Sequence, residues 1–323
     1  MNSDLKNNTL PEKPDRRPVF SVIMNCLNGD PFLRQAIDSV YSQTFKDWEI
    51  IFWDNASTDR TAEIACSYGS QLRYFRSAES VSLGTARNLA VAKARGEFIA
   101  FLDSDDLWLP DKLKTQYQVF DRCPEIALIY GNLFYIDNKS ASRRLAFTKE
   151  QPQGDVFRIF LKSYPINLQT VALRKVILDR LDEIFDPELH LSEEYDLFMR
   201  ILHDYQAAYI NEPLAMYRIH PGQTGTRFME KYPEENLKVI TKLHGMEKGF
   251  SDTYRSELEF LRAKIAYWEA KAAMQRNDPA GARRRLKAFK AVSPVFQALY
   301  YSTVLPSRLW LKLQDLRYRI RIS

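Results

Sequence analysis

The chain has 323 residues, of which 45% are hydrophobic and 13% aromatic, a composition that supports a large folded core and excludes global disorder. The net charge of +5 is unevenly distributed: residues 276–323 contain eleven Lys or Arg against two Asp, so the preceding part of the chain has a net charge of −4. A basic end on an acidic body predicts contact with an anionic partner, either a membrane surface or a nucleic acid.

The N-terminal part of the chain alternates predicted strands and helices. Residues 1–17 are polar and are expected to form a disordered leader. Short apolar runs after this leader predict strands, and apolar residues at helical spacing predict helices between them. In chain order the strands are 19–24, 48–53, 72–75 and 98–102, and the helices are 31–43, 58–68 and 85–94. Such alternation predicts an α/β fold with a mostly parallel central sheet and flanking helices.

The alternation becomes less regular after Pro110. A strand is predicted over 126–137, and the polar segment 139–152 is predicted to be a loop. The remaining elements of this part are helices over 155–163 and 193–203 and extended segments over 169–175 and 207–218. Together with the preceding elements they are expected to form one α/β domain over 18–227.

The segment 228–323 is expected to be a helical C-terminal region. Its clearest helices, 254–276 and 279–291, are separated by a short polar break and predict a helical hairpin. A last helix over 306–322 has apolar residues at helical spacing with basic residues around them; the apolar positions are Leu309, Leu313, Leu316 and Ile320. The region is therefore predicted to end in a basic amphipathic helix.

Three carboxylates follow the predicted strand that ends at Leu102, namely Asp103, Asp105 and Asp106. They are expected at the carboxyl edge of the sheet, where α/β proteins bind ligands. Close carboxylates repel one another unless a cation neutralises them, and oxygen ligands suit Mg²⁺ or Mn²⁺, which in turn binds phosphate oxygens. The alternative is an acidic turn that caps the helix starting near Pro110. The chain has neither a G-x-G-x-x-G nor a G-x-x-x-x-G-K-[ST] pattern, so a metal and nearby cations are the expected phosphate ligands.

Five short segments, in the same order along the chain, resemble the family 2 glycosyltransferases of the GT-A fold. They are residues 21–24, 42–51, 54–59, 84–88 and 101–106. The resemblance implies a Rossmann-like, mostly parallel sheet and an inverting transferase that depends on Mg²⁺ or Mn²⁺. It also implies a nucleotide diphospho-sugar donor, most commonly a UDP-sugar, and a hydroxyl of a saccharide or lipid-linked acceptor, in the synthesis of envelope polysaccharide or glycolipid.

The resemblance implies nucleotide-binding roles for several residues at the sheet edge. Asp54 matches the position that binds the base, and Arg87 is expected to reach the nucleotide in bidentate fashion. Asp103 matches the first acid of the family's DXD element, which contacts ribose or metal, and Asn28 and Ser104 are further expected nucleotide contacts. The residues alone leave alternatives open, since Asp54 could simply form a turn that caps the next helix and Arg87 could simply pair with a nearby acid.

The resemblance also implies metal and catalytic roles. Asp105 matches the acid that ligates the metal on the diphosphate, with Asp103 as a further ligand and His220 completing the metal shell as in some members. Glu194 stands where the family has its catalytic base, usually Asp, and Asp196 is the expected supporting acid. The alternatives are that these acids complement the dipole of a helix N-terminus, and that His220 is an ordinary loop residue.

The chain departs from the family pattern at three positions near the expected base-binding site. Leu27 replaces a Tyr that stacks near the base in many relatives, and Asn55 and Ala56 replace a frequent Asp-Gly pair. These departures weaken the expectation that the base is uracil.

We expect the terminal helix, 306–322, to lie on an anionic membrane surface with Trp310 and Tyr318 at the interface. The alternative is a helix that packs on the rest of the protein and leaves a solvated basic rim. No nucleic-acid-binding module accompanies the charge, so nucleic acid is not an expected partner. A non-catalytic, membrane-associated module with the same fold is the alternative to an enzyme, although Asp103, Asp105 and Glu194 argue for catalysis.

Cysteine content and hydropathy favour a cytoplasmic protein. The three cysteines are odd in number and lack metal-ligand spacing, which favours reduced thiols over a disulfide framework. The leader lacks the apolar segment of a signal peptide, and no run of about eighteen apolar residues predicts a transmembrane helix. We therefore expect a cytoplasmic protein that the basic terminal helix could hold at the inner face of the cytoplasmic membrane.

Overall fold

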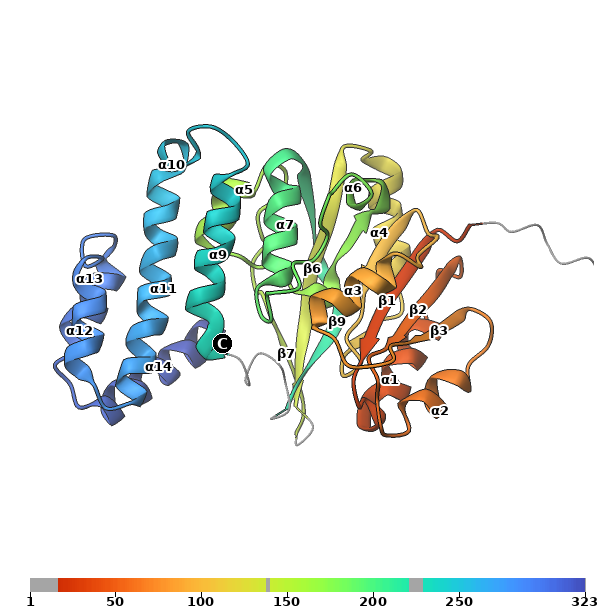
Figure 1. The fold of residues 1–323 in the computed structure, drawn as a ribbon, viewed down its shortest axis with the longest axis horizontal. Coiled ribbons are helices and arrows are strands. Elements are labelled where there is room, and N and C mark those ends of the chain that lie inside the picture. The colour runs from red at the N-terminus through yellow and green to blue at the C-terminus, as the bar shows by residue number, and fades with distance from the viewer. Residues whose placement is uncertain (1–16, 138–139, 221–228, 323) are drawn as a thin grey trace, which may run out of the picture.

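The computed structural model describes residues 17–137, 140–220 and 229–322, and within them one nine-stranded sheet with a helical part beside it (Figure 1). The strands are β1 (Phe20–Cys26), β2 (Trp48–Asp54), β3 (Leu72–Arg76), β4 (Phe98–Phe101), β5 (Leu107–Trp108), β6 (Ile126–Asp137), β7 (Ser140–Leu145), β8 (Ala172–Arg174) and β9 (Gln206–Ile219). Their order across the sheet is β3-β2-β1-β4-β8-β6-β9-β5, with β7 paired to β6.

The first four strands form the parallel half of the sheet. Strands β3, β2, β1 and β4 are parallel neighbours, and every residue of β2 is buried, as expected for a strand that is covered on both faces. The connecting helices are α1 (Asp30–Tyr41), α2 (Thr61–Cys66) and α3 (Leu83–Val91). The core on one face contains side chains of α1 and α2, and the core on the other contains side chains of α3. The predicted alternation of strands and helices is confirmed here.

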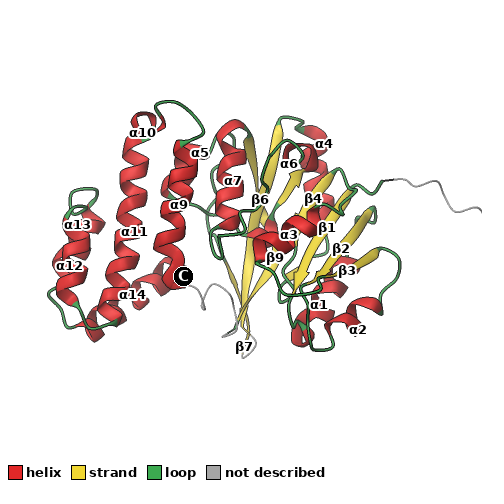
Figure 2. Ribbon diagram, in the orientation of Figure 1, coloured by secondary structure: helices red, strands yellow, loops and turns green. Residues whose placement is uncertain are grey.

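The other half of the sheet has mixed pairing (Figure 2). Strand β8 is antiparallel to both β4 and β6, whereas β9 is parallel to β6 and antiparallel to β5. The extended segment predicted over 169–175 divides into a 3-10 turn (Leu168–Thr170), β8 and the short helix α6 (Lys175–Leu178). The mostly parallel sheet that the alternation predicts is therefore found in the first four strands.

The prediction of a loop over 139–152 is wrong for Ser140–Leu145, which form β7. Strand β6 is twelve residues long, and β7 pairs with its last part, from Phe134 onward. The guanidinium of Arg144 lies 5.0 Å from the ring centroid of Tyr135 on β6. The strand is thus made by backbone pairing and long polar side chains, so its sequence lacks the apolar alternation that indicates a strand.

The remaining helices surround the second half of the sheet and continue into the helical part. They are α4 (Lys112–Arg122), α5 (Phe157–Lys162), α7 (Glu193–Asp204), α9 (Tyr232–His244), α10 (Phe250–Thr253), α11 (Arg255–Gln275), α12 (Pro279–Lys287), α13 (Pro294–Ser302) and α14 (Ser307–Ile322), with a 3-10 turn at Met229–Lys231. The core on the α3 face continues through α7 to α9 and α11, because Leu197, Val239 and Leu258 belong to one buried cluster. Helices α11 and α12 form the predicted hairpin.

The prediction that Trp310 lies at a membrane interface is wrong. Its side chain is fully buried, with its ring centroid 6.1 Å from that of Tyr267 on α11, and its indole N–H donates to Ser302 Oγ on α13 at 2.9 Å. Two side chains of the predicted apolar stripe are partly exposed to solvent: Leu309 is 46% and Leu313 is 43% exposed. The side chain of Tyr318 lies outside the described residues, as do those of Leu316 and Ile320.

Among the helices that the structure describes, none has the length and apolar content to cross a bilayer.

Candidate active site

A cleft of about 890 Å³ opens at the carboxyl ends of β1 and β4. Its walls come from the loops after these strands, the start of α3, the segment before β8 and the N-terminus of α7. Since parallel strands end at one edge of a sheet, residues that are far apart in the sequence meet here. The predicted site residues that line the cleft are Asn28, Arg87, Asp103, Ser104, Asp105, Glu194 and His220.

Asp105 and His220 form the pair best suited to hold a cation. The carboxylate Oδ2 of Asp105 lies 2.8 Å from His220 Nε2, and the His220 ring packs on Phe32 with centroids 5.2 Å apart. No group of three or more His, Cys, Asp or Glu among the described residues has the geometry of a closed metal site. Mg²⁺ is commonly held by one or two carboxylates with the rest of its shell from phosphate and water, so the carboxylate of Asp105 fits such a cation. The ring nitrogen of His220 suits a transition-metal ion better than Mg²⁺.

Asp103 lies beside this pair and is held by two side chains. Its Oδ1 accepts from Arg87 Nη2 at 3.3 Å, and its Oδ2 accepts from Gln169 Nε2 at 3.1 Å. Burial raises the pKa of Asp103, the nearby charge of Asp105 raises it further, and Arg87 opposes both effects. The carboxylate is therefore oriented by the protein at the edge of the cleft.

Asp106 does not cap α4, the alternative considered from the sequence. Its buried carboxylate Oδ1 accepts from the backbone N–H of Arg218 at 2.7 Å, and α4 begins only at Lys112. Burial, together with the charges of Asp105 and Asp103, raises the pKa of Asp106 well above its ordinary value. Asp106 thus ties the acidic loop to the end of β9, which also brings His220 to the cleft.

Arg87 joins the two acidic clusters of the site. Arg87 is 4% exposed; its Nη1 donates to Glu193 Oε1 at 2.6 Å, and its Nη2 donates to Asp103. Arg87 therefore pairs with nearby acids, as one interpretation of the sequence predicted, and it also lines the cleft. Glu193, which the sequence analysis did not assign, has an Oε2 atom that is buried without a partner among the described residues.

Glu194 is placed at the N-terminus of α7, where the cleft adjoins a second cavity. Burial raises its pKa to about 8, and the neighbouring charge of Glu193 contributes to the increase. A carboxyl whose pKa lies near neutral pH can take up a proton during a reaction, which is the property expected of a general base.

The catalytic role predicted for Asp196 is not supported by its position. Residues two apart on a helix point to different faces, and Asp196 does not line the cleft that Glu194 lines. Its fully buried carboxylate Oδ2 accepts from Arg200 Nη2 at 2.8 Å and from Lys242 Nζ at 3.1 Å. Because Lys242 belongs to α9, this contact joins α7 to the helical part.

Asp54 is likewise turned away from the cleft. Its Oδ1 accepts from the backbone N–H of Ser57 at 2.7 Å, and its Oδ2 accepts from the Tyr74 hydroxyl at 2.6 Å and from Arg76 Nη1 at 3.2 Å. The side chain is fully buried and its oxygens are occupied, so a base-binding role for Asp54 is not supported. Asp54 instead forms a turn through its hydrogen bond with Ser57, which was the alternative that the sequence left open.

The next residue, Asn55, lines the cleft in its place. Its amide group exchanges two hydrogen bonds with the backbone of Val81, with distances of 2.9 and 3.0 Å. Leu27, 52% exposed, and Asn28, whose Oδ1 accepts from the Thr58 backbone N–H at 2.8 Å, complete this end of the cleft. The sequence signal for Asn55 was its position directly after Asp54, the polar residue that ends β2.

The sequence of the chain is similar to those of known glycosyltransferases. Residues 21–180 match the family described as Glycosyl transferase family 2. The Escherichia coli protein named UDP-Glc:alpha-D-GlcNAc-diphosphoundecaprenol beta-1,3-glucosyltransferase WfgD is 32% identical over 194 residues, which cover 60% of this chain and 73% of that protein.

Solved structures show the same fold. S. aureus TarS 1–349 in complex with UDP-GlcNAc has a TM-score of 0.66 and 20% identity, over 93% of this chain and 91% of that one. The mannosyltransferase PcManGT from Pyrobaculum calidifontis, in complex with GDP-Man and Mn²⁺, has a TM-score of 0.59 and 16% identity, over 94% of this chain and 88% of that one.

Proposed function

The chain belongs to glycosyltransferase family 2 and has the GT-A fold, and from this premise we propose that it is an inverting, metal-dependent enzyme that transfers a sugar from a nucleotide diphospho-sugar to an acceptor hydroxyl. The observation that carries the proposal is that Asp105 and His220, which lie 2.8 Å apart, line the same cleft as Glu194. A cation-binding pair and a proton acceptor are the two groups that such a transfer needs.

The proposed donor is a UDP-sugar. TarS was solved with UDP-GlcNAc and the name of WfgD gives UDP-Glc as its donor, which supports a uridine nucleotide here. The exposed side chain of Leu27 offers an apolar surface for the base in the cleft beside Asn28. Asp103 and Ser104, which follow β4 and also line the cleft, are the proposed contacts for ribose and phosphate.

Asp105 and His220 are the proposed ligands of Mg²⁺ or Mn²⁺, with Asp103 beside them. The Mn²⁺ complex of PcManGT supports this choice of cation. A cation held by these residues would supply positive charge to the leaving diphosphate. Arg87 keeps Asp103 in position for this task, since its guanidinium bridges that carboxylate and Glu193.

Glu194 is the proposed base of the transfer. The acceptor oxygen forms a bond to the anomeric carbon while the bond between this carbon and the diphosphate oxygen breaks, so the nucleoside diphosphate leaves with the electron pair. The proton of the acceptor hydroxyl passes to the Glu194 carboxylate. A single displacement of this kind inverts the anomeric configuration.

The proposed acceptor is a lipid-linked sugar, in the synthesis of an envelope polysaccharide or glycolipid. The name of WfgD gives GlcNAc-diphosphoundecaprenol as the acceptor of that enzyme, which supports an acceptor of the same class here. The second candidate, a non-catalytic module that retains the fold, would release no nucleoside diphosphate from any donor.

Donor binding tests the proposed function directly. We expect one class of nucleotide sugar, the UDP-sugars, to raise the melting temperature of the protein by several degrees when Mn²⁺ is present and much less without it. The measurement is a thermal shift with a panel of nucleotide sugars, repeated with EDTA. A folded protein that no nucleotide sugar stabilises would instead support the non-catalytic module.

We further propose that the end of the helical part lies on an anionic membrane surface. Exposed apolar side chains gather there: Tyr301 is 55%, Val304 75% and Leu309 46% exposed. The exposed basic residues Arg308 and Lys312 on α14 lie among them in the sequence. Apolar and basic side chains on one short segment favour the interface of a bilayer that contains anionic lipid.

Charge reversal of the two basic residues tests this surface. Each Lys or Arg near an anionic bilayer contributes ~1 kcal/mol, so we expect R308E/K312E to weaken binding to vesicles that contain anionic lipid by at least ~20-fold. The matched control K114E/R122E reverses two exposed charges on α4 and should leave binding unchanged. Vesicle flotation measures both, and equal binding of the two double variants would contradict the membrane surface.

A further inference from the structure

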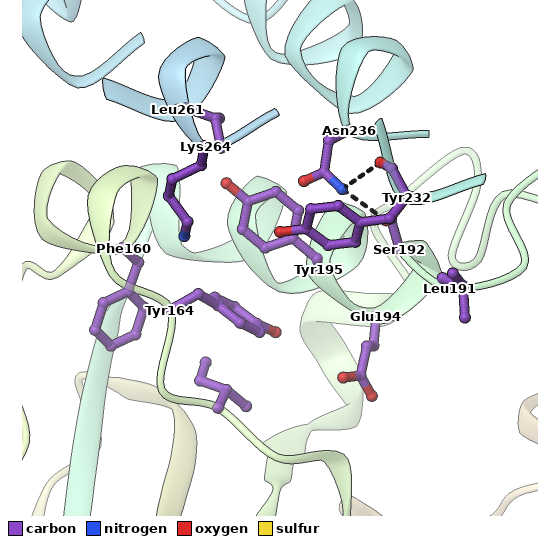
Figure 3. Close-up of a pocket in the computed structure, with 11 residues that line it drawn as sticks. Phe160, Tyr164, Leu191, Ser192, Glu194, Tyr195, Tyr232, Asn236, Leu261 and Lys264 are labelled. Carbon is purple, nitrogen blue, oxygen red and sulfur yellow. Dashed lines mark hydrogen bonds between the residues drawn. The ribbon is translucent and has the colours of Figure 1, made fainter. Parts of the chain in front are cut away.

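A cavity of about 240 Å³ adjoins the cleft at the N-terminus of α7 (Figure 3). It lies where the α/β part meets helices α9 and α11, and it shares the side chains of Leu191 and Glu194 with the cleft. Glu194 therefore stands between two spaces, one of them large enough for a nucleotide sugar. The smaller one lies below the ~300–1,000 Å³ of pockets for drug-sized ligands, so it suits a single sugar ring.

Three tyrosines form much of the cavity wall: Tyr164, Tyr195 and Tyr232. The rings of Tyr164 and Tyr195 are perpendicular, with centroids 4.8 Å apart. Tyr195 is 9% exposed, and the buried hydroxyls of both rings lack a hydrogen-bond partner among the described residues. Buried hydroxyls are usually paired, so these two indicate a polar ligand.

The wall beside Tyr232 is held in place by hydrogen bonds. The side-chain amide of Asn236 donates to Ser192 Oγ at 3.2 Å and to the Tyr232 backbone oxygen at 2.8 Å, as the dashed lines in Figure 3 show. The first bond connects α9 to the residue that precedes α7, and the second lies within α9. Together they fix the position of the Asn236 side chain in the cavity wall.

Lys264 of α11 brings a positive charge to the same cavity, and Figure 3 shows its amino group directed toward the tyrosines. Its Nζ donates to the backbone oxygen of Lys162 at 3.4 Å, and no carboxylate of the described residues lies within ion-pair distance of it. Burial lowers its pKa, as expected for an ammonium group without an anionic partner. A phosphate bound beside Lys264 would favour the charged form of this amino group.

We propose that this cavity binds the acceptor, and that the acceptor is a sugar carrying a phosphate or diphosphate group. The sugar ring packs against Tyr164 and Tyr195, its reacting hydroxyl faces Glu194, and its phosphate pairs with Lys264. Aromatic faces with hydroxyl groups at their edges bind the mixed apolar and polar surface of a sugar. The inference rests on the proposed transferase activity, since it assigns the second substrate of that reaction.

Binding of two matched probes to the protein loaded with UDP and Mn²⁺ tests the proposal. One probe is α-N-acetylglucosaminyl diphosphate with a short alkyl chain, and the other is the same alkyl glycoside without phosphate. We expect the wild type to bind the phosphorylated probe ~10-fold or more tightly than the neutral one, which is the effect of a charge-assisted hydrogen bond. Isothermal titration calorimetry measures both affinities.

Variants on one helix separate recognition of the phosphate from stability. Lys264→Met should lose the preference for the phosphorylated probe, whereas the control Arg262→Met removes an exposed positive charge from α11 and should keep it. Tyr195→Phe should weaken binding of both probes and leave their ratio unchanged, and it provides a second variant if Lys264→Met does not fold.

The outcomes separate this proposal from the proposed function. UDP binding without probe binding to the wild type would overturn the acceptor cavity and leave the transferase assignment standing. An unchanged preference in Lys264→Met would overturn the phosphate contact, as would tighter binding of an alkyl glucuronide than of the phosphorylated probe. Absence of UDP binding in the same samples would overturn the proposed function instead.

Discussion

Glu194→Gln should lower the rate of sugar transfer by ~10²–10⁴-fold, the usual contribution of a general base, and leave donor binding intact. The amide has nearly the shape of the carboxyl group but cannot accept the proton of the acceptor hydroxyl. Rates of nucleoside diphosphate release with acceptor, together with donor affinity from thermal shifts, measure the two effects separately.

The pH dependence of the wild type provides a second measurement of the same residue. The base acts only when it is deprotonated, and the pKa of Glu194 is raised to about 8 by burial and by Glu193. Transfer should therefore increase with pH and level off above about pH 8. Glu194→Gln should lack this increase in its residual activity.

The pH dependence of stability measures the raised pKa of Glu194 independently of sugar transfer. The carboxyl of a glutamate in the unfolded chain has a pKa of ~4.3, so between this value and about 8 the folded protein holds a proton that the unfolded chain has released. This linkage lowers the stability of the wild type progressively as the pH rises through that range. Glu194→Gln should thus melt at a higher temperature than the wild type at pH 8, with the difference vanishing near pH 4.

A matched control is Glu188→Gln, which neutralises an exposed carboxylate in the loop before α7. We expect wild-type transfer and an unchanged melting temperature for this variant. Full transfer by Glu194→Gln would identify another residue as the base, and a lower melting temperature at pH 8 would show that the carboxyl stabilises the fold.

The parts of the site that follow a buried strand were predictable from the sequence. Asp103 and Asp105 come directly after an uninterrupted apolar run, and the ends of parallel strands meet at one edge of the sheet. The same rule could not choose between two polar neighbours at the end of β2. Asp54 turns to Tyr74 on the next strand, whereas Asn55 lines the cleft, and only the side-chain contacts distinguish them.

Contacts between distant segments were not predictable from local patterns. Arg87 and Glu193 are 106 residues apart in the sequence, and their ion pair depends on how α3 and α7 pack. Asp196 matched the expected family position but binds Lys242 of α9, a helix whose packing no motif describes. Trp310 is of a residue type common at membrane interfaces, but here it is buried against α11 and α13. In each case tertiary packing decided the role of the side chain.

Asp105→Asn should abolish the stabilisation that UDP provides in the presence of Mn²⁺. The substitution removes the negative charge from one of the two proposed protein ligands, and His220 alone provides a single ring nitrogen. A ligand at about 100 times its Kd stabilises a protein by ~2.7 kcal/mol, so loss of binding is readily detected. The measurement is the melting temperature with UDP, with and without Mn²⁺.

The effect on turnover should be at least ~100-fold, because charge stabilisation by a bound cation is worth several kcal/mol in the transition state. Treatment of the wild type with EDTA should reproduce the result, and Asp121→Asn, which removes an exposed carboxylate from α4, should have no effect. Among the described residues, the carboxylate of Asp105 has one hydrogen-bond partner, His220. The backbone oxygen of Asp105, which accepts from Arg218 Nε, is unchanged by the substitution, so the variant is expected to fold normally. Stabilisation by UDP that persists unchanged in Asp105→Asn and still requires Mn²⁺ would place the cation on other ligands, with Asp103 as the first residue to test.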